Sequence, residues 1–250
     1  PVQTHADNMF QPRAVDIDEA AKQAVSLLVN SPNNPTGAVY SRESLTEIAD
    51  VCKKHDLWLI SDEVYDNQIW EGEHISPRAL EGMQERTLVI GSMSKSHAMT
   101  GSRIGWIVAP EKVIECLIDL ATNTTYGVAG FIQDAAEFAL AQGLPLEDKV
   151  AAPFRRRRDL AADIFENAAT VKLVPAQGAM YLMLDIRATG LSGEEFANRL
   201  LDERKIAVMP GESFGQAAAG HLRVAMTVDD DRFVSALKVL SDFADSLRAT

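Results

Sequence analysis

One lysine lies in a loop rich in small and hydroxyl side chains, and this loop holds the residues best suited to covalent chemistry. Lys95 follows Ser92 and Ser94, Arg103 comes eight residues later, and glycines flank the segment. A lysine between apolar segments is costly to bury as a bare ammonium, so it should be solvated, paired or used chemically. Hydroxyls, glycine backbone and an arginine fork suit a phosphate beside a reactive amine. This combination predicts pyridoxal 5'-phosphate held as a Schiff base on Lys95.

The segments around this loop indicate how it is positioned. The apolar run 88–90 precedes it and the run 104–109 follows it, so the pattern predicts a loop between two buried strands. In open α/β sheets, ligands bind where the strands end. The lysine therefore stands at the expected place for a ligand-binding residue.

Two further polar motifs follow predicted strands upstream. The strand 25–29 leads into Asn33-Asn34-Pro35-Thr36-Gly37, and the strand 57–60 leads into Asp62-Glu63-Val64-Tyr65. Between them, residues 41–55 have the apolar spacing of an amphipathic helix. A strand, a helix and a strand in this order predict a largely parallel sheet.

Together these motifs resemble those of the class I/II aminotransferases of fold type I, the aspartate aminotransferase-like enzymes. Ser92-Met93-Ser94-Lys95 and Gly101-Ser102-Arg103-Ile104-Gly105 match the lysine motif of that family, and Arg223 follows in Leu222-Arg223-Val224. The resemblance implies an α/β large domain over residues 1–155, with a mainly parallel sheet that lacks its N-terminal part. It implies a smaller α+β domain over residues 156–250, and a homodimer.

The resemblance also implies a role for each residue around the cofactor ring. Lys95 would form the Schiff base and then act as general base at the substrate Cα and as acid at the cofactor. Asp62 would pair with the pyridine nitrogen and keep it protonated, and Tyr65 would hydrogen-bond the phenolic oxygen. A helix-capping aspartate and a core tyrosine are the structural alternatives.

The remaining roles concern the phosphate and the substrate. By the same resemblance, Arg103 would bind the phosphate with Ser92 and Ser94 as further candidates, and Arg223 would bind the substrate α-carboxylate. Asn34 would hydrogen-bond the ring oxygen and approach the substrate carboxylate. As alternatives, Asn34 would satisfy its own turn, and Arg223 would face solvent from a strand.

The predicted activity is transfer of an amino group between an amino acid and a 2-oxo acid. A C–S β-lyase of the same fold shares every motif, and an effector-binding aminotransferase-like domain of a transcription regulator is a third possibility. The family's phosphate loop and stacking aromatic are not found here, so the 250-residue chain alone could also be inert. The absence of a Gly-x-Gly-x-x-Gly motif after a strand disfavours a Rossmann oxidoreductase.

Composition limits the partners. The net charge of −12 argues against nucleic acid or an anionic membrane surface as the main partner, and Arg155–Arg158 are expected on a solvated or ion-paired helix face. No apolar run approaches a membrane span, so a cytoplasmic location is expected. Cys52 and Cys116 are expected as buried thiols, and no histidine or cysteine spacing predicts a metal site.

Several local features are also predicted. Residues 1–6 are expected as a strand, and Ser44 with Glu47 as a capping box. His97 is expected as a loop or surface histidine. Residues 146–168 are expected as a long helix and 206–209 as a strand.

Overall fold

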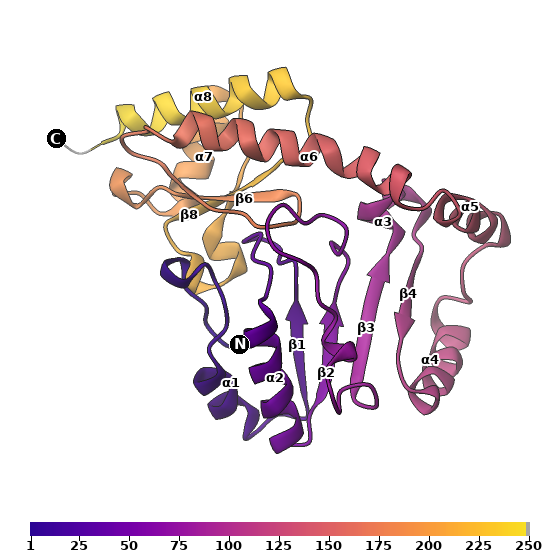
Figure 1. Cartoon of the computed structure of the whole chain (residues 1–250). Helices are drawn as coiled ribbons and strands as arrows, with labels where there is room; N and C mark the ends of the chain where they lie inside the picture. The colour runs from indigo at the N-terminus through magenta and orange to yellow at the C-terminus, as the bar shows by residue number, and fades with distance from the viewer. Residues whose placement is uncertain (249–250) are drawn as a thin grey trace. The chain divides into compact units, whose positions relative to one another are not determined.

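The chain folds into two compact units, shown in the computed structural model of Figure 1, which describes residues 1–248. The first unit contains Pro1–Gln3, Gln11–Pro32 and Val39–Ala151. The second contains Thr4–Phe10, Asn33–Ala38 and the chain from Ala152 onward. Asn33–Ala38 therefore belongs to the second unit, although the strand before it belongs to the first.

The first unit is built on a four-stranded sheet in the order β1-β2-β3-β4, visible side by side in Figure 1. Its strands are β1 (Ser26–Asn30), β2 (Trp58–Asp62), β3 (Thr87–Ser92) and β4 (Gly105–Val108). The first three are parallel, and β4 is antiparallel to β3, with residues 93–104 connecting the two. The prediction of an α/β fold with a mainly parallel sheet is confirmed.

Helices α1 to α5 belong to the first unit. They are α1 (Ala14–Ala21), α2 (Arg42–Lys54), α3 (Met93–Ser96), α4 (Glu111–Thr124) and α5 (Gly130–Leu140). The α2 helix joins β1 to β2 and buries its apolar side chains. Ser41 is its N-cap and accepts a hydrogen bond from the Ser44 amide at 3.1 Å. The predicted capping box is wrong, because Ser44 lies inside the first turn.

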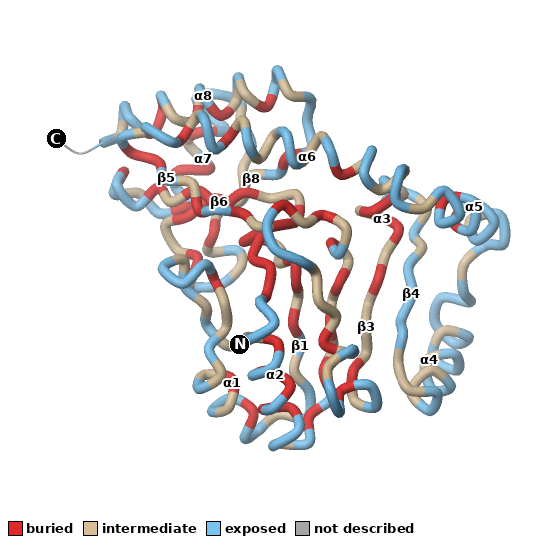
Figure 2. The backbone as a smooth tube through the Cα atoms, viewed as in Figure 1, coloured by how far each residue is buried: buried red, intermediate tan, exposed pale blue. Residues whose placement is uncertain are grey.

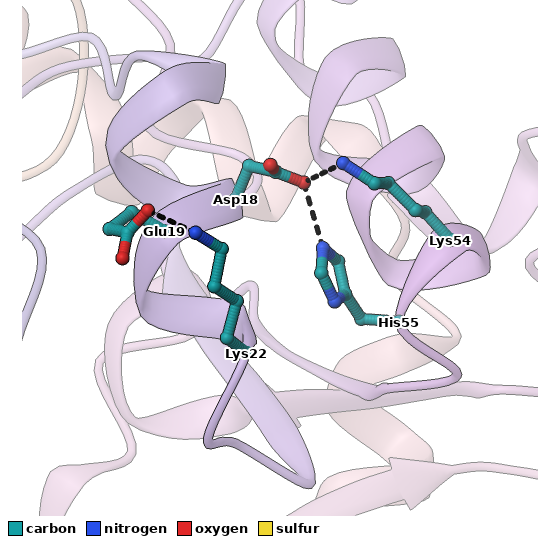
Figure 3. A network of polar contacts seen from close by, with 5 residues as sticks. All are labelled: Asp18, Glu19, Lys22, Lys54 and His55. Carbon is teal, nitrogen blue, oxygen red and sulfur yellow. Dashed lines mark hydrogen bonds and ion pairs between the residues drawn. The ribbon is translucent and has the colours of Figure 1, made fainter.

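Polar side chains join α1 to α2 (Figure 3). The Asp18 carboxylate lies 2.7 Å from Lys54 Nζ and 2.8 Å from His55 Nε2. The Lys54 hydrogen bond, followed by that of His55, holds the pKa of Asp18 below its ordinary value. Within α1, Glu19 pairs with Lys22. This network fixes the first helix against the crossover helix.

The second unit has an α+β fold with an antiparallel sheet in the order β5-β6-β8-β7. Its strands are β5 (Lys172–Val174), β6 (Tyr181–Asp185), β7 (Met209–Pro210) and β8 (His221–Ala225). Its helices are α7 (Gly193–Arg204) and α8 (Asp230–Ser246), and α6 (Leu144–Phe165) enters it from the first unit. Short 3-10 helices cover Ala6–Asn8, Pro77–Ala79, Thr100–Ser102, Arg187–Thr189, Gly211–Phe214 and Gln216–Ala218.

The core of the second unit lies between its sheet and helices. Phe196 and Phe243 meet edge to face at 5.3 Å between ring centroids. Arg156 and Arg157 of α6 pair with Asp230 at the start of α8. The predicted ion-paired face is confirmed for these two arginines.

Three local predictions are wrong. Residues 1–5 carry no regular structure, and the helix Ala6–Asn8 stands where the predicted strand would end. Only Met209 of the predicted strand 206–209 is in a strand, which ends at Pro210. All four residues of β4, the edge strand of this sheet, are exposed, so the predicted buried strand 104–109 is wrong. Within residues 1–248, no helix is long and apolar enough to cross a membrane.

Candidate active site

Lys95 follows β3 directly. Ser92 ends the strand and caps α3, where its Oγ accepts a hydrogen bond from the Ser94 amide at 3.0 Å. This cap fixes the short helix that carries the lysine. Lys95 is half-buried, and nothing within residues 1–248 forms an ion pair or a side-chain hydrogen bond with its amine. The amine is therefore available for chemistry.

Asp62 ends β2, the strand beside β3. Asp62 pairs with Ile90 of β3 in the sheet register. Ser92, two positions after Ile90, lies on the same face of the sheet. The half-buried carboxylate accepts a hydrogen bond from the Val64 amide at 3.3 Å. Burial raises the pKa of Asp62 above its ordinary value, the Val64 hydrogen bond opposes this shift, and the charge of Glu63 adds to it. Such a carboxylate gains most from a cationic partner.

Arg103 closes the lysine loop. The adjacent strand β4 begins at Gly105, which pairs with Ser92, so Arg103 lies at the sheet end where β3 delivers the lysine. Its Nη1 donates to the Thr100 carbonyl at 2.9 Å, and its backbone is left-handed with φ 53°. The exposed guanidinium keeps further donors for an anion.

The segment after β2 contains a buried contact between a histidine and a carboxylate that the sequence did not predict. The Glu63 carboxylate lies 2.9 Å from His74 Nε2 and accepts a hydrogen bond from Ser76 Oγ at 2.8 Å. Its side chain is only 7% exposed. Tyr65 is buried in the same turn. The pair therefore secures the segment that connects Asp62 to Tyr65.

Asn34 and Arg223 meet in the second unit. Arg223 Nη1 donates to Asn34 Oδ1 at 3.1 Å. The guanidinium carbon lies 4.4 Å from the Tyr181 ring centroid and 4.8 Å from that of Phe214. Arg223 is half-buried, and no carboxylate within residues 1–248 pairs with it. A stacked, partly desolvated arginine without a counterion is suited to bind a carboxylate.

The loop that carries Asn34 is held by its own turn and by the second unit. Asn33 Oδ1 accepts hydrogen bonds from the amide and the hydroxyl of Thr36. The turn-stabilising asparagine is therefore Asn33, and Asn34 faces Arg223. Gly37 has φ +71°. Its carbonyl accepts hydrogen bonds from the backbone amides of Gln177 at 2.9 Å and Gly178 at 2.8 Å.

Two other residues differ from expectation. His97 is buried, because Ser96 Oγ lies 2.7 Å from its Nδ1 and helix α6 supplies Glu147 at 3.7 Å from its Nε2. Cys52 is buried as predicted, and burial raises its pKa to about 11. The prediction of a buried Cys116 is wrong, since α4 buries none of its residues.

No group of three or more potential metal ligands occurs within the described residues.

Comparison with known proteins identifies the family. The model for aminotransferases of class I and II matches residues 1–240. The chain therefore belongs to this family, whose members use pyridoxal 5'-phosphate. The unpaired amine of Lys95, the half-buried carboxylate of Asp62 and the exposed guanidinium of Arg103 fit that cofactor.

The relatives include several aminotransferases. Arginine–pyruvate transaminase AruH of Pseudomonas aeruginosa is 42% identical over 229 residues, which cover 91% of this chain and 58% of that protein. Aromatic-amino-acid aminotransferase 2 of Thermococcus litoralis is 35% identical over 243 residues, covering 94% and 61%. The chain thus spans about three fifths of the length of these curated relatives.

Solved structures agree with this assignment. The aromatic aminotransferase of Pyrococcus horikoshii matches with a TM-score of 0.94 and 32% identity, over 98% of this chain and 66% of that one. The aspartate aminotransferase of Thermus thermophilus with maleate matches with a TM-score of 0.89 and 33% identity, over 96% and 63%. The aspartate aminotransferase-like fold is confirmed.

Proposed function

We propose that the whole protein is a pyridoxal-phosphate-dependent aminotransferase that moves an amino group between an α-amino acid and a 2-oxo acid. The observation that carries this proposal is the unpaired, half-buried amine of Lys95 at the end of β3. The names of the relatives support it, since they include transaminases of arginine and pyruvate, of aromatic amino acids and of aspartate. These substrates share an α-amino acid group.

Lys95 is assigned two tasks. Its amine would hold the cofactor covalently, and Nζ, when free, would take the proton from the substrate Cα. The bound cofactor supplies an electron sink for that step. Because no acid within residues 1–248 pairs with Lys95, the amine loses no ion pair there when it gives up its charge.

Asp62 is assigned to the pyridine nitrogen. Burial raises the pKa of this carboxyl, so its ionised form lacks solvation in the protein alone. A protonated ring nitrogen would provide the missing positive charge, and the carboxylate in turn would hold the proton on that nitrogen. Tyr65 is assigned to donate its phenolic O–H to the ring oxygen.

The phosphate is assigned to Arg103, Ser92 and Ser94. Arg103 uses one N–H group on the Thr100 carbonyl and has four others for phosphate oxygens. The Ser92 hydroxyl accepts a hydrogen bond as a helix cap, which leaves its own O–H to donate. Ser92 pairs with Gly105 in the sheet register, so these hydroxyls and Arg103 belong to the same end of the sheet.

Arg223 is assigned to the substrate α-carboxylate. Tyr181 and Phe214 restrict the plane of its guanidinium, and Asn34 occupies one of its N–H groups. The fork is thereby oriented before a carboxylate arrives, which reduces the entropy lost on binding. Asn34 is further assigned to the cofactor ring oxygen.

Two properties of the whole protein are proposed from the family alone. A homodimer is expected, and analytical ultracentrifugation will show it as a sedimenting species of twice the chain mass. A cytoplasmic location is expected, and cell fractionation tests it.

Product analysis tests the proposed activity. The protein, extended to the length of its relatives, is incubated with pyridoxal phosphate, an amino acid and a 2-oxo acid. We expect a new amino acid and a new oxo acid in equal amounts, and none with the variant Lys95→Ala. Release of ammonia and pyruvate without an acceptor would identify a β-lyase instead. Equal turnover by Lys95→Ala would refute the assigned role of Lys95.

A further inference from the structure

His97 lies on the buried side of the single helical turn that carries Lys95. It follows Met93 by four residues, so these two side chains share a face of α3, and Lys95 is about 200° away around the helix axis. Met93 is 1% exposed and packs against Ala136 and Ala139 of α5. Figure 2 shows the buried residues of α3 in red, beside its label. The His97 side chain is 2% exposed, whereas Lys95 is half-buried, so the turn is anchored on the side opposite its lysine.

The hydrogen-bond pattern decides which nitrogen of His97 carries a hydrogen. Ser96 Oγ lies 3.1 Å from the carbonyl oxygen of Ser92, which can only accept, and 2.7 Å from His97 Nδ1. A hydroxyl has a single hydrogen, and Ser96 donates it to Ser92, so the Ser96 oxygen accepts from an N–H at Nδ1. His97 Nε2 is buried and makes no hydrogen bond within residues 1–248, since Glu147 Oε1 is 3.7 Å away. A hydrogen on Nε2 alone would therefore lack an acceptor there.

Two hydrogen bonds thus run in series, from His97 Nδ1–H to Ser96 Oγ and from the Ser96 hydroxyl to the carbonyl of Ser92. Ser92 is the last residue of β3, where it pairs with Gly105. The series closes the segment between its ends, which contains Lys95. A helix of one turn is not stable by itself, because nucleation fixes several residues for one hydrogen bond. The side chains of Ser96 and His97 therefore supply order that the helical backbone alone cannot.

We propose that His97 is a positioning residue, which acts through Ser96 to hold α3 in the conformation that presents the Lys95 amine to the cofactor. This inference rests on the proposed function, because only a lysine that reacts needs a defined placement. A reacting group loses rate when it is displaced by even a small distance. His97 lies on the other side of the turn from Lys95 and is assigned no contact with the reacting atoms.

Two variants of similar shape separate the hydrogen bond from the packing of the side chain. His97→Asn keeps an N–H on an atom bonded to Cγ, as Nδ1 is, whereas His97→Leu keeps the branched shape without a donor. Loss of one such hydrogen bond changes an equilibrium about two- to tenfold. We therefore expect amide hydrogen exchange of α3, measured without cofactor, to be about two- to tenfold faster in His97→Leu than in His97→Asn. His55→Leu, which removes a histidine that contacts α1 instead, should leave this exchange unchanged.

The reaction of Lys95 is a measurement that a purely structural role of His97 would not affect. Pyridoxal phosphate is added to the protein extended to the length of its relatives, and the borohydride-reduced adduct on Lys95 is quantified over time. We expect adduct formation to be slower by about twofold or more in His97→Leu, and His97→Asn to restore it toward the wild-type rate. Ser96→Ala should slow it similarly, and adding His97→Leu to Ser96→Ala should change it no further, because the two residues act in one series.

Three results would overturn the proposal. These are equal amide exchange in His97→Asn and His97→Leu, an unchanged rate of adduct formation on Lys95 in His97→Leu, and additive effects of Ser96→Ala and His97→Leu. A wild-type protein that forms no adduct on Lys95 would refute the proposed function, and this inference with it. Normal adduct formation in the wild type with any of the three results would refute this inference alone.

Discussion

His74→Ala should destabilise the first unit far more than His55→Ala, although the two histidines are equally buried. Their side chains are 17% and 18% exposed, and each Nε2 lies within 2.9 Å of a carboxylate. The carboxylates differ. Glu63, the partner of His74, is 7% exposed, whereas Asp18 is 31% exposed and keeps its second partner Lys54. The pair therefore isolates the effect of burying the acceptor.

The expected magnitudes follow from this difference. Removing a hydrogen bond to a buried charged group costs about 1.5–3 kcal/mol, and among the described residues Glu63 would keep only Ser76 as a side-chain donor. An exposed pair contributes about 0.2–1 kcal/mol. The loss of the imidazole volume is common to both variants. We therefore expect the folding equilibrium to fall roughly 10- to 150-fold for His74→Ala and at most about fivefold for His55→Ala.

Urea unfolding followed by tryptophan fluorescence measures this effect. Trp58, Trp70 and Trp106 are the three tryptophans of the chain, and all lie in the first unit. The signal therefore reports this unit, even if the two units unfold separately. Midpoints are compared at equal slope. Equal losses in the two variants would refute the reasoning, because they would show that burial of the Glu63 pair adds nothing.

Three further predictions concern the second unit. Arg223→Lys keeps the charge but loses the fork, so kcat/KM for an amino acid substrate should fall about 10- to 150-fold, as expected for about 1.5–3 kcal/mol; an unchanged kcat/KM would remove Arg223 from the carboxylate site. Burial alone would raise the pKa of Glu212, but hydrogen bonds from backbone amides bring it below its ordinary value of 4.5. The ionised Glu212 carboxylate therefore stabilises the folded unit above pH 4.5, and this stabilisation is lost as the pH falls through the folded-state pKa. Amide hydrogen exchange in this unit should therefore accelerate with acid beyond its intrinsic pH dependence, and less so in Glu212→Gln; identical profiles would contradict this. Gly37→Ala should cost about 1–3 kcal/mol in chemical unfolding, since φ is +71° and the new Cβ would lie 2.7 Å from an alanine Cβ. Gly190→Ala, with φ +75° in open space, is the matched control, and an equal loss there would show that only φ matters.

The sequence was sufficient for the parts of the site that depend on local pattern. Lys95 and Asp62 each follow an apolar strand directly, and strand ends are visible in the sequence. Because the strands are parallel, their carboxyl ends lie at one side of the sheet. The family resemblance then provided roles that the pattern alone could not.

The contacts that depend on tertiary structure were not predictable. Glu63 and His74 are separated by a turn, and no periodic pattern connects them. His97 is buried by a helix that begins far along the chain. Cys116 lies on an apolar helix face that this chain leaves exposed, so the pattern predicted burial where none occurs.

The most direct test of the proposed function is to locate the cofactor on the chain. The protein, both as the 250-residue chain and extended upstream, is incubated with pyridoxal phosphate, reduced with borohydride, digested and mapped by mass spectrometry. We predict a reduced pyridoxyl-phosphate adduct on the peptide containing Lys95 in the extended protein, together with a visible absorption band that amino acids bleach. An adduct on other lysines only, or no band in the extended protein, would contradict the assignment of Lys95 as the residue that holds the cofactor.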